Sequence, residues 1–197
     1  MSWFNSSYKE INDEALMVKV QNGDHKAFED LYDRYAEFLF KYFFRRLWKD
    51  KEKSEDFVQD VFTKIIQNPE SFDSGRSFKT WIFSIANNMT INEYKKQEVR
   101  KNTVPGLNLE AERVISDQNP LKNVENKIFK EALEKELGRL DEKHRTCFEL
   151  RHINGFSNKE VAEMLGISEG TVKSRLFNAI KNISEALKVF QTEMKMN

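Results

Sequence analysis

Seven side chains between residues 171 and 181 have the chemistry to bind DNA. They include hydroxyls, an amide, an aromatic ring and three cations, with no acidic residue among them. At helical spacing six of them share one side, and Arg175 lies on its flank. Such groups meet phosphate oxygens, base-edge acceptors and thymine methyl groups. We expect this surface to bind duplex DNA; the alternative is an ordinary solvated basic face. The residues are Thr171, Lys173, Ser174, Arg175, Phe177, Asn178 and Lys181.

Two short helices joined by a tight turn must position this surface. Ser157 and Glu160 have the spacing of a capping box, which begins a helix. Gly166 favours the end of that helix, because glycine adopts the left-handed conformation at low cost. Ser168 can then cap a second helix, whose apolar residues recur at helical spacing. The pattern predicts a helix-turn-helix whose second helix enters the major groove. Its apolar stripe consists of Val172, Leu176, Ala179, Ile180, Ile183 and Leu187.

Helical periodicity also dominates the first half of the chain. It predicts helices over about residues 24–48, from a cap at Ser54 onward, and over about 77–98. Residues 102–126 lose this pattern and hold two of the three prolines, which is typical of a flexible linker. Strand signals are scarce. The chain is therefore predicted to be all-α, with two small helical domains, residues 1–101 and 127–197, joined by that linker.

The predicted helix over residues 77–98 combines aromatic rings, amides and cations. This mixture suits unpaired DNA, because exposed bases stack on rings while lysines hold phosphates. Helical aromatics are more often core residues, and one side carries a predicted core stripe. That stripe consists of Phe78, Trp81, Ile82, Ile85 and Met89. The residues predicted to face away from it are Lys79, Thr80, Phe83, Asn87, Thr90 and Tyr94, followed by Lys95.

Composition narrows the classes of function. Lys and Arg number 32, as do Asp and Glu, so nucleic acid must meet local basic patches such as residues 41–53 and 79–101. Cys147 is the only cysteine and is expected to be buried, and the histidines lack metal-ligand spacing. We therefore expect no metal site and no cofactor. No segment approaches the roughly 18 apolar residues of a membrane span, which predicts no membrane insertion and a cytoplasmic location.

Linked motifs carry a family resemblance. The chain contains, in this order, SEDFVQDVF, FKTWIFSIANN, the predicted linker and LGRLDEKHRTCFELRHINGFSNKEVAEMLGISEGTVKSRL. Over about residues 20–101 and 128–188 it resembles the extracytoplasmic-function (ECF) group of bacterial RNA polymerase sigma factors. The resemblance implies a protein that is not an enzyme and that directs core RNA polymerase to promoters to initiate transcription.

The resemblance also implies a division of labour. In that family the first domain binds the clamp helices of the polymerase β′ subunit and melts the downstream promoter element. The second domain binds the β flap and reads the upstream element. Lys173, Ser174, Arg175 and Asn178 match the contact face of the family's recognition helix. The expected partners are thus the polymerase core and promoter DNA, and the family adds an anti-sigma factor.

The resemblance also implies roles for residues of the first domain. Asp56, Gln59 and Asp60 match the contacts to the clamp helices. Residues 71–77, together with Trp81, Asn87 and Asn88, match the element that captures a base flipped from the non-template strand. Extruding a base costs a few kcal/mol, which contacts in the pocket must offset. The residues assigned to the melted strand are Lys79, Trp81, Phe83, Asn87, Asn88, Tyr94 and Lys95.

Several positions depart from the family pattern. Asp141 follows Leu140 where proline is usual, and asparagine at 87, 92 and 178 replaces the frequent arginine, aspartate and arginine. Losing two cations weakens phosphate attraction, and a changed base-edge donor alters discrimination by ~1–3 kcal/mol per pair. Our hypothesis is that another DNA-bound partner supplements promoter recognition.

Two alternatives stay open at the level of sequence. In a stand-alone helix-turn-helix regulator, residues 1–101 would serve dimerisation or sensing instead of polymerase binding. In a nuclease, Asp56 and Asp60, one helical turn apart, would share a metal ion, although no P-loop or histidine pair accompanies them.

Overall fold

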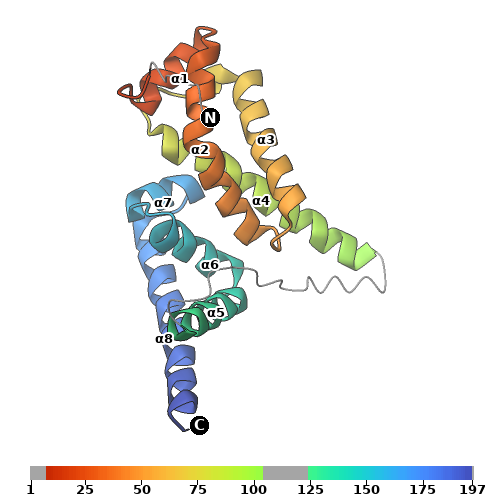
Figure 1. Ribbon diagram of the computed structural model, residues 1–197, viewed down its shortest axis with the longest axis vertical. Helices are drawn as coiled ribbons and strands as arrows, with labels where there is room; N and C mark the ends of the chain where they lie inside the picture. The colour runs from red at the N-terminus through yellow and green to blue at the C-terminus, as the bar shows by residue number, and fades with distance from the viewer. Residues whose placement is uncertain (1–7, 104–123, 197) are drawn as a thin grey trace. The chain divides into compact units, whose positions relative to one another are not determined.

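The computed structural model describes residues 8–103 and 124–196, and these residues form eight α-helices and no strand (Figure 1). The chain divides into two compact units, Met1–Ile115 and Ser116–Asn197. The predicted all-α class with two helical regions is thereby confirmed. The boundaries at residues 101 and 127 stay predictions, and residues 104–123 of the predicted linker lie outside the described residues. In the described ranges no helix combines the length and the hydropathy needed to span a membrane.

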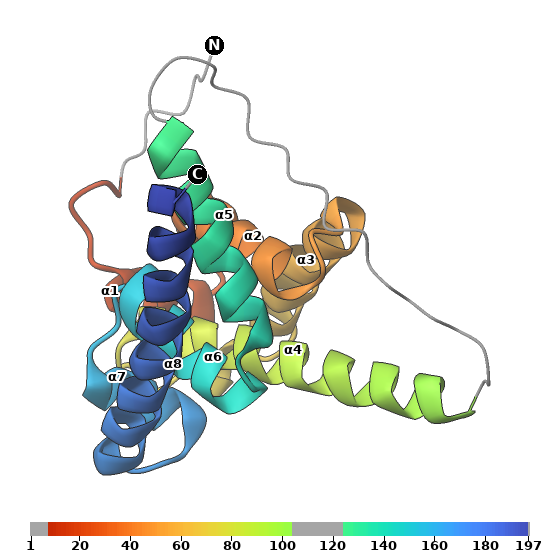
Figure 2. The same ribbon diagram turned by 90° about the horizontal axis from the view of Figure 1, so that it is seen from below.

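Four helices form the N-terminal unit. They are α1 (Asp13–Gln21), α2 (His25–Arg46), α3 (Lys51–Gln67) and α4 (Phe78–Thr103), with a short 3-10 turn, Pro69–Ser71, between α3 and α4. Helices α2 and α4 each contact the other three. The C-terminal end of α4 extends beyond these neighbours (Figure 2).

Helix α1 was not predicted, yet its start has a clear chemical cause. The Asn12 side chain accepts a hydrogen bond from the backbone N–H of Ala15 at 2.8 Å. Asp13 and Glu14 follow in the first turn, where the helix dipole favours acidic residues. The residues that the helix buries are Leu16, Met17 and Val20.

The predicted cap at Ser54 was wrong. Helix α3 begins one turn earlier, because the Asp50 carboxylate accepts a hydrogen bond from the backbone N–H of Lys53 at 3.0 Å. Ser54 is fully buried inside the helix and its hydroxyl donates to the Asp50 carbonyl. Serine hydroxyls inside helices commonly bond the carbonyl four residues back, which removes them from a capping role.

Helix α4 is covered on more sides than its periodicity predicted. Phe78 and Ile82 are fully buried as expected. The Phe78 ring lies 5.2 Å from the Tyr35 ring and 5.6 Å from the Phe72 ring, centre to centre, in edge-on contacts that link three segments of the unit. Four residues assigned to the opposite face are also buried, because α1, α2 and α3 all pack against this helix. These residues are Thr80, Phe83, Asn87 and Thr90.

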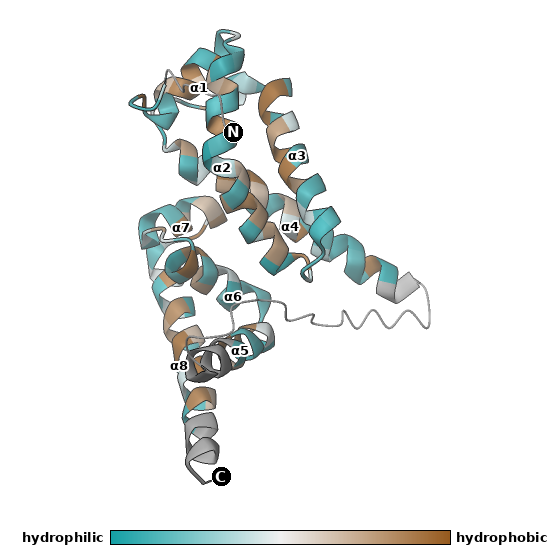
Figure 3. Ribbon diagram, in the orientation of Figure 1, coloured by the Kyte–Doolittle hydropathy of each residue, from teal (hydrophilic) through white to brown (hydrophobic). Residues whose placement is uncertain are grey.

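The C-terminal unit is built around α8 (Glu169–Met196), which packs against α5 (Val124–Arg139), α6 (Glu142–Phe148) and α7 (Asn158–Leu165). Figure 3 shows both polar and apolar residues along α3 and along the coloured part of α8. Their buried residues recur every three or four positions, as in an amphipathic helix. Cys147 is buried as predicted, and burial raises the pKa of its thiol. The buried core includes Leu150, Phe156, Val161, Val172 and Ala179.

Candidate nucleic-acid and polymerase interfaces

The predicted helix-turn-helix is present in α7 and α8. The backbone N–H of Ser157 donates to the Glu160 carboxylate at 2.7 Å, and the N–H of Glu160 donates to the Ser157 hydroxyl at 3.2 Å, which completes the capping box. Gly166 ends α7 with φ +62°, and a Cβ there would meet no atom within 4 Å. Backbone conformation, and not crowding, therefore requires glycine. Ser168 accepts the backbone N–H of Thr171 at 3.1 Å and starts α8.

Most of the predicted duplex-binding residues are exposed on α8. The five that are exposed are Lys173, Ser174, Phe177, Asn178 and Lys181, and the Phe177 side chain is 69% exposed. Thr171 is half-buried and its hydroxyl lies 2.9 Å from that of Ser168. The opposite side is buried through Val172, Leu176, Ala179 and Ile183, whereas Ile180, assigned to that stripe, is exposed. A polar and cationic face thus stands clear of the core.

Arg175 lies on the flank of this face, as predicted, and is half-buried. Its guanidinium interacts with the Cys147 thiol of α6, and this interaction opposes the rise that burial causes in the pKa of the thiol. Arg175 therefore lies near α6 as well as at the edge of the exposed face.

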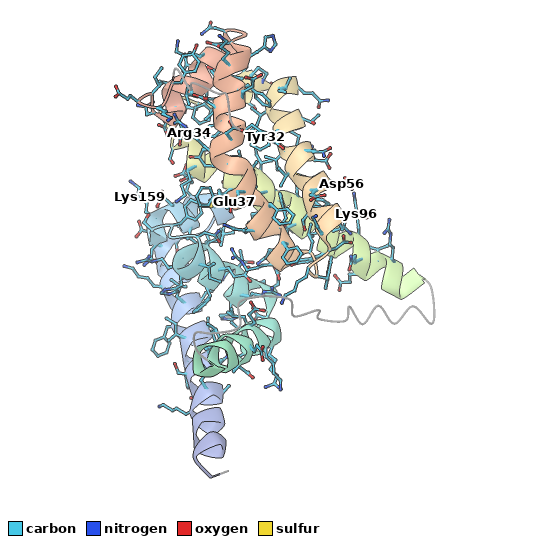
Figure 4. The ribbon with its side chains drawn as sticks, viewed as in Figure 1. Tyr32, Arg34, Glu37, Asp56, Lys96 and Lys159 are labelled. Carbon is cyan, nitrogen blue, oxygen red and sulfur yellow. The ribbon has the colours of Figure 1, made fainter. Side chains whose placement is uncertain are left out.

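The predicted polymerase-binding residues share the outer side of α3. Asp56, Gln59 and Asp60 are all exposed, while Val58 and Val61 of the same helix are buried. Asp56 is labelled in Figure 4, where its side chain points away from the helix bundle. Within the described ranges, no three His, Cys, Asp or Glu residues form a group that could hold a metal ion.

The residues predicted to meet the melted strand are only partly available. Lys79, Asn88 and Lys95 are exposed, and Trp81 and Tyr94 are half-buried. The exposed role predicted for Phe83 and Asn87 was wrong, since both side chains are 1% exposed. The Tyr42 hydroxyl donates to Asn87 Oδ1 at 3.2 Å, and the Tyr42 ring lies 5.6 Å from that of Phe83. Both residues belong to the packing between α2 and α4.

Comparison with known proteins identifies the family to which the two helical units belong. Residues 31–100 match the family model "Sigma-70 region 2", and residues 130–183 match "Sigma-70, region 4". The chain is 30% identical to the ECF RNA polymerase sigma-E factor of Haemophilus influenzae over 91% of its own length and 97% of that protein. The chain belongs to the ECF family of RNA polymerase sigma factors.

Other relatives agree with this assignment. The chain is 28% identical to the ECF RNA polymerase sigma factor BldN of Streptomyces coelicolor, over 87% of this chain but only 64% of that protein. The sigma factor RpoE of Bartonella quintana, solved with the anti-sigma factor NepR, has 25% identity and a TM-score of 0.69, covering 83% of this chain and 98% of that one. As a sigma factor, this protein is a DNA-binding transcription initiation factor that works with core RNA polymerase. The stand-alone regulator is not favoured.

The connection between α3 and α4 of this sigma factor is exposed but internally bonded. Residues 73–77 are exposed, whereas Phe72 is buried and its ring lies 5.1 Å from that of Trp81. The N–H of Gly75 donates to the Asp73 carboxylate at 2.9 Å, and the N–H of Arg76 to the Asp73 carbonyl at 3.0 Å. These bonds form a compact turn beside the half-buried indole.

Two side chains of α1 reach this connection. Gln21 donates to the carbonyls of Pro69 and Phe72, and Glu14 accepts the backbone N–H of Phe78. No sequence pattern revealed these contacts, because the partners lie 48, 51 and 64 residues apart along the chain. The only local signal was the cap that begins α1.

The basic patch predicted over residues 41–53 is smaller than its composition indicates. Arg46 is buried, and Lys53 pairs with the buried Glu93 at 2.6 Å. Trp48 and Lys49, in the turn between α2 and α3, both have positive φ, at 56° and 60°. The Trp48 ring lies 5.3 Å from that of Tyr94, and this contact helps to hold the unusual turn.

Proposed function

We propose that this sigma factor uses its C-terminal unit to read duplex promoter DNA and its N-terminal unit to bind polymerase and hold the melted strand. The observation that carries the proposal is the exposed polar and cationic face of α8, opposite a buried apolar side. Such a helix in a helix-turn-helix enters the major groove, where its cations meet phosphates and its amide and hydroxyl meet base edges. The proposed contacts are Thr171, Lys173, Ser174, Arg175, Phe177, Asn178 and Lys181.

For the polymerase, we propose that Asp56, Gln59 and Asp60 bind the clamp helices of the β′ subunit. All three are exposed on one side of α3, so two carboxylates and an amide can bond to a partner without rearrangement of the helix. In the family the second domain binds the β flap of the polymerase, and we propose the same contact for the C-terminal unit of this chain.

For the melted strand, we propose contacts from residues 71–77 and from the exposed and half-buried side chains of α4 that the family resemblance assigned to it. The exposed lysines suit phosphates, and the half-buried rings can stack on a base with the side they leave open. Phe83 and Asn87 are buried and cannot contact the strand; they pack α4 against Tyr42 of α2. The remaining residues of α4 are Lys79, Trp81, Asn88, Tyr94 and Lys95.

Two further partners are proposed. The Bartonella relative was solved with an anti-sigma factor, which supports an anti-sigma factor for this chain. Asparagine at position 178 lacks the charge frequent there in the family, which supports a DNA-bound partner that recruits the complex to promoters. We place this activity in the cytoplasm, where polymerase and chromosome meet.

Run-off transcription with purified core polymerase on a random promoter library tests the proposal, because it measures activity and recovers the preferred promoter together. Lys173→Ala should weaken binding of the recovered upstream duplex by roughly three- to tenfold and reduce the salt dependence by about one counterion. Core polymerase binding should not change. Lys143→Ala, which removes an exposed lysine of α6, is the matched control.

The double variant Gln59→Ala/Asp60→Ala should show the opposite behaviour, with weaker core binding and unchanged binding of the upstream duplex. Equal effects of both variants on both measurements would contradict the division of labour. Failure of the purified chain to select start sites with any related bacterial core would contradict the function itself. Transcription that is equally strong with and without accessory proteins would contradict the proposal of a DNA-bound recruiting partner.

A further inference from the structure

We infer that Glu14 and Gln21 of α1 are positioning residues that hold the connection between α3 and α4 ready to capture an unpaired base. This inference rests on the proposed role of residues 71–77 and extends it to a helix with no assigned role. Neither side chain is placed in the DNA-contact surface. Each acts on backbone groups at one end of the connection.

Gln21 fixes the start of the connection. Its side-chain amide donates to the carbonyl of Pro69 at 3.1 Å and to the carbonyl of Phe72 at 3.0 Å. One amide NH₂ group has two donors, so a single side chain satisfies both carbonyls. Pro69 begins the short Pro69–Ser71 turn and Phe72 follows it, so the bonds of both carbonyls to one nitrogen keep that turn closed.

Glu14 fixes the end of the connection. Its carboxylate accepts the backbone N–H of Phe78, the first residue of α4, at 2.9 Å. The first N–H groups of a helix have no partner inside the helix, and a carboxylate there also complements the helix dipole. The Ser77 hydroxyl accepts the N–H of Thr80 at 3.3 Å, which places a second acceptor at this terminus.

Helix α1 is itself anchored on α2, so it can serve as a rigid support. Arg34, labelled in Figure 4, donates to Asp13 Oδ1 at 2.6 Å and to the Ile11 carbonyl at 2.9 Å. The Tyr35 hydroxyl donates to the other oxygen of Asp13. Burial and the bond to Asp13 raise the pKa of Tyr35, which keeps its hydroxyl protonated and available as a donor.

The consequence for function is preorganisation. With both ends held, residues 73–77 present one exposed turn next to Trp81, and a flipped base does not have to order them on binding. Releasing one end would leave every proposed contact residue in place but let the turn adopt other conformations. The loss should then fall on the captured base and not on contacts elsewhere along the strand.

The test uses the full chain with core polymerase and two fork-junction DNA probes built on the promoter recovered above. One probe carries the intact non-template strand, and the other has an abasic site at the base on which binding depends most. The wild type should prefer the intact probe by roughly ten- to a hundredfold, the range expected for loss of one stacked base. In Gln21→Ala this preference should fall about five- to tenfold, with little change for the abasic probe.

Two controls separate positioning from general destabilisation. Asn22→Ala removes a neighbouring amide whose bond stays within α1, to the carbonyl of Val18, and should keep the full preference. Glu14→Gln retains an acceptor for the Phe78 N–H and should resemble the wild type, whereas Glu14→Ala should resemble Gln21→Ala. Core binding and upstream duplex binding should be unchanged in all of them.

Equal losses on the intact and abasic probes, or none, would overturn the inference. If Gln21→Ala fails to bind core, Gln21→Met, which keeps the chain length without a donor, repeats the comparison. Failure of both variants to bind core would make the role structural and also overturn it. A wild type that does not distinguish the two probes would instead contradict the proposed base capture.

Discussion

The two units shape their contact surfaces with hydrogen bonds of different range. In the C-terminal unit the caps described above join residues three apart, as between Ser157 and Glu160 or between Ser168 and Thr171. In the N-terminal unit Gln21 reaches partners 48 and 51 residues away, and Glu14 reaches one 64 residues away. The recognition helix is thus specified by its immediate neighbours, whereas the base-capture connection takes its shape only when the whole unit has folded.

This difference has a functional consequence. The recognition helix should tolerate the loss of one capping hydrogen bond, because each cap contributes separately to the stability of the C-terminal unit and core packing still holds the helix in place. The proposed melting surface depends on α1, α2 and α4 together, so a change in any of them should reach it. Substitutions that cut long-range contacts should therefore have larger and less local effects than substitutions that remove caps.

The largest effect is expected for Phe78→Ala. Phe78 is fully buried and its ring contacts those of Tyr35, Phe72 and Trp81, so truncation should cost about 3–5 kcal/mol of unfolding free energy in the N-terminal unit. Hydrogen exchange of each unit in the full chain measures this, together with core binding. Phe177→Ala, at an exposed ring, should leave the stability of both units nearly unchanged. Equal loss of protection in the two units would show that they do not unfold separately.

A smaller but still long-range effect is expected for Lys53→Met. The Lys53 ammonium lies 2.6 Å from the carboxylate of Glu93, 40 residues away, and the Glu93 side chain is only 9% exposed. Leaving that carboxylate without its cation should cost about 2–3 kcal/mol in chemical denaturation, less than a fully buried pair because Lys53 is partly solvated.

Two variants test whether burial is the cause. Lys53→Met/Glu93→Leu should recover most of the loss, since no buried charge is left behind. Lys51→Met breaks the exposed pair between Lys51 and Glu55, at 3.7 Å, and should cost under about 1 kcal/mol. Similar losses in Lys51→Met and Lys53→Met would argue that burial of Glu93 is irrelevant.

A local effect is expected for Ser157→Ala in the capping box. It removes the acceptor for the Glu160 N–H and should lower the stability of the C-terminal unit by about 1 kcal/mol, with no change in core binding through the N-terminal unit. Ser184→Ala, at an exposed position within α8, is the control and should be neutral or slightly stabilising. A loss of base capture in Ser157→Ala would break the separation between local and long-range support.

The same contrast explains what could be predicted from the sequence. The helix-turn-helix, its capping box and the glycine at its turn were predicted correctly, because each signal and its partner lie within one helical turn. The burial of Phe83 and Asn87 was not, because periodicity cannot reveal how many neighbours surround a helix, and three helices cover α4. The contacts of Glu14 and Gln21 depend on the folded topology alone.

Competition between neighbours explains the remaining errors. Asp50 and Ser54 were both able to begin α3. The Asp50 carboxylate does so, because it accepts the Lys53 N–H, whereas the Ser54 hydroxyl donates to the Asp50 carbonyl inside the helix. Ile180 has the spacing of the apolar stripe on α8 but is exposed, since the stripe is wider than the surface that the neighbouring helices cover.

The smallest expected effect is a pH dependence at Asp141, one of the departures from the family pattern. Its carboxylate caps α6 by accepting the backbone N–H of His144 at 3.0 Å, and this bond is the main cause that lowers the pKa of Asp141 from its ordinary value of 3.8. A group with a lowered pKa in the folded state stabilises the protein above its unfolded value, and this contribution is lost as the pH falls through the folded value. Asp141→Asn keeps a capping oxygen but cannot titrate. The wild type should therefore have the higher urea midpoint near neutral pH, and its advantage over the variant should shrink below about pH 4. A constant difference from about pH 3 to pH 7 would mean that this cap does not depend on charge and that geometry alone sets its contribution.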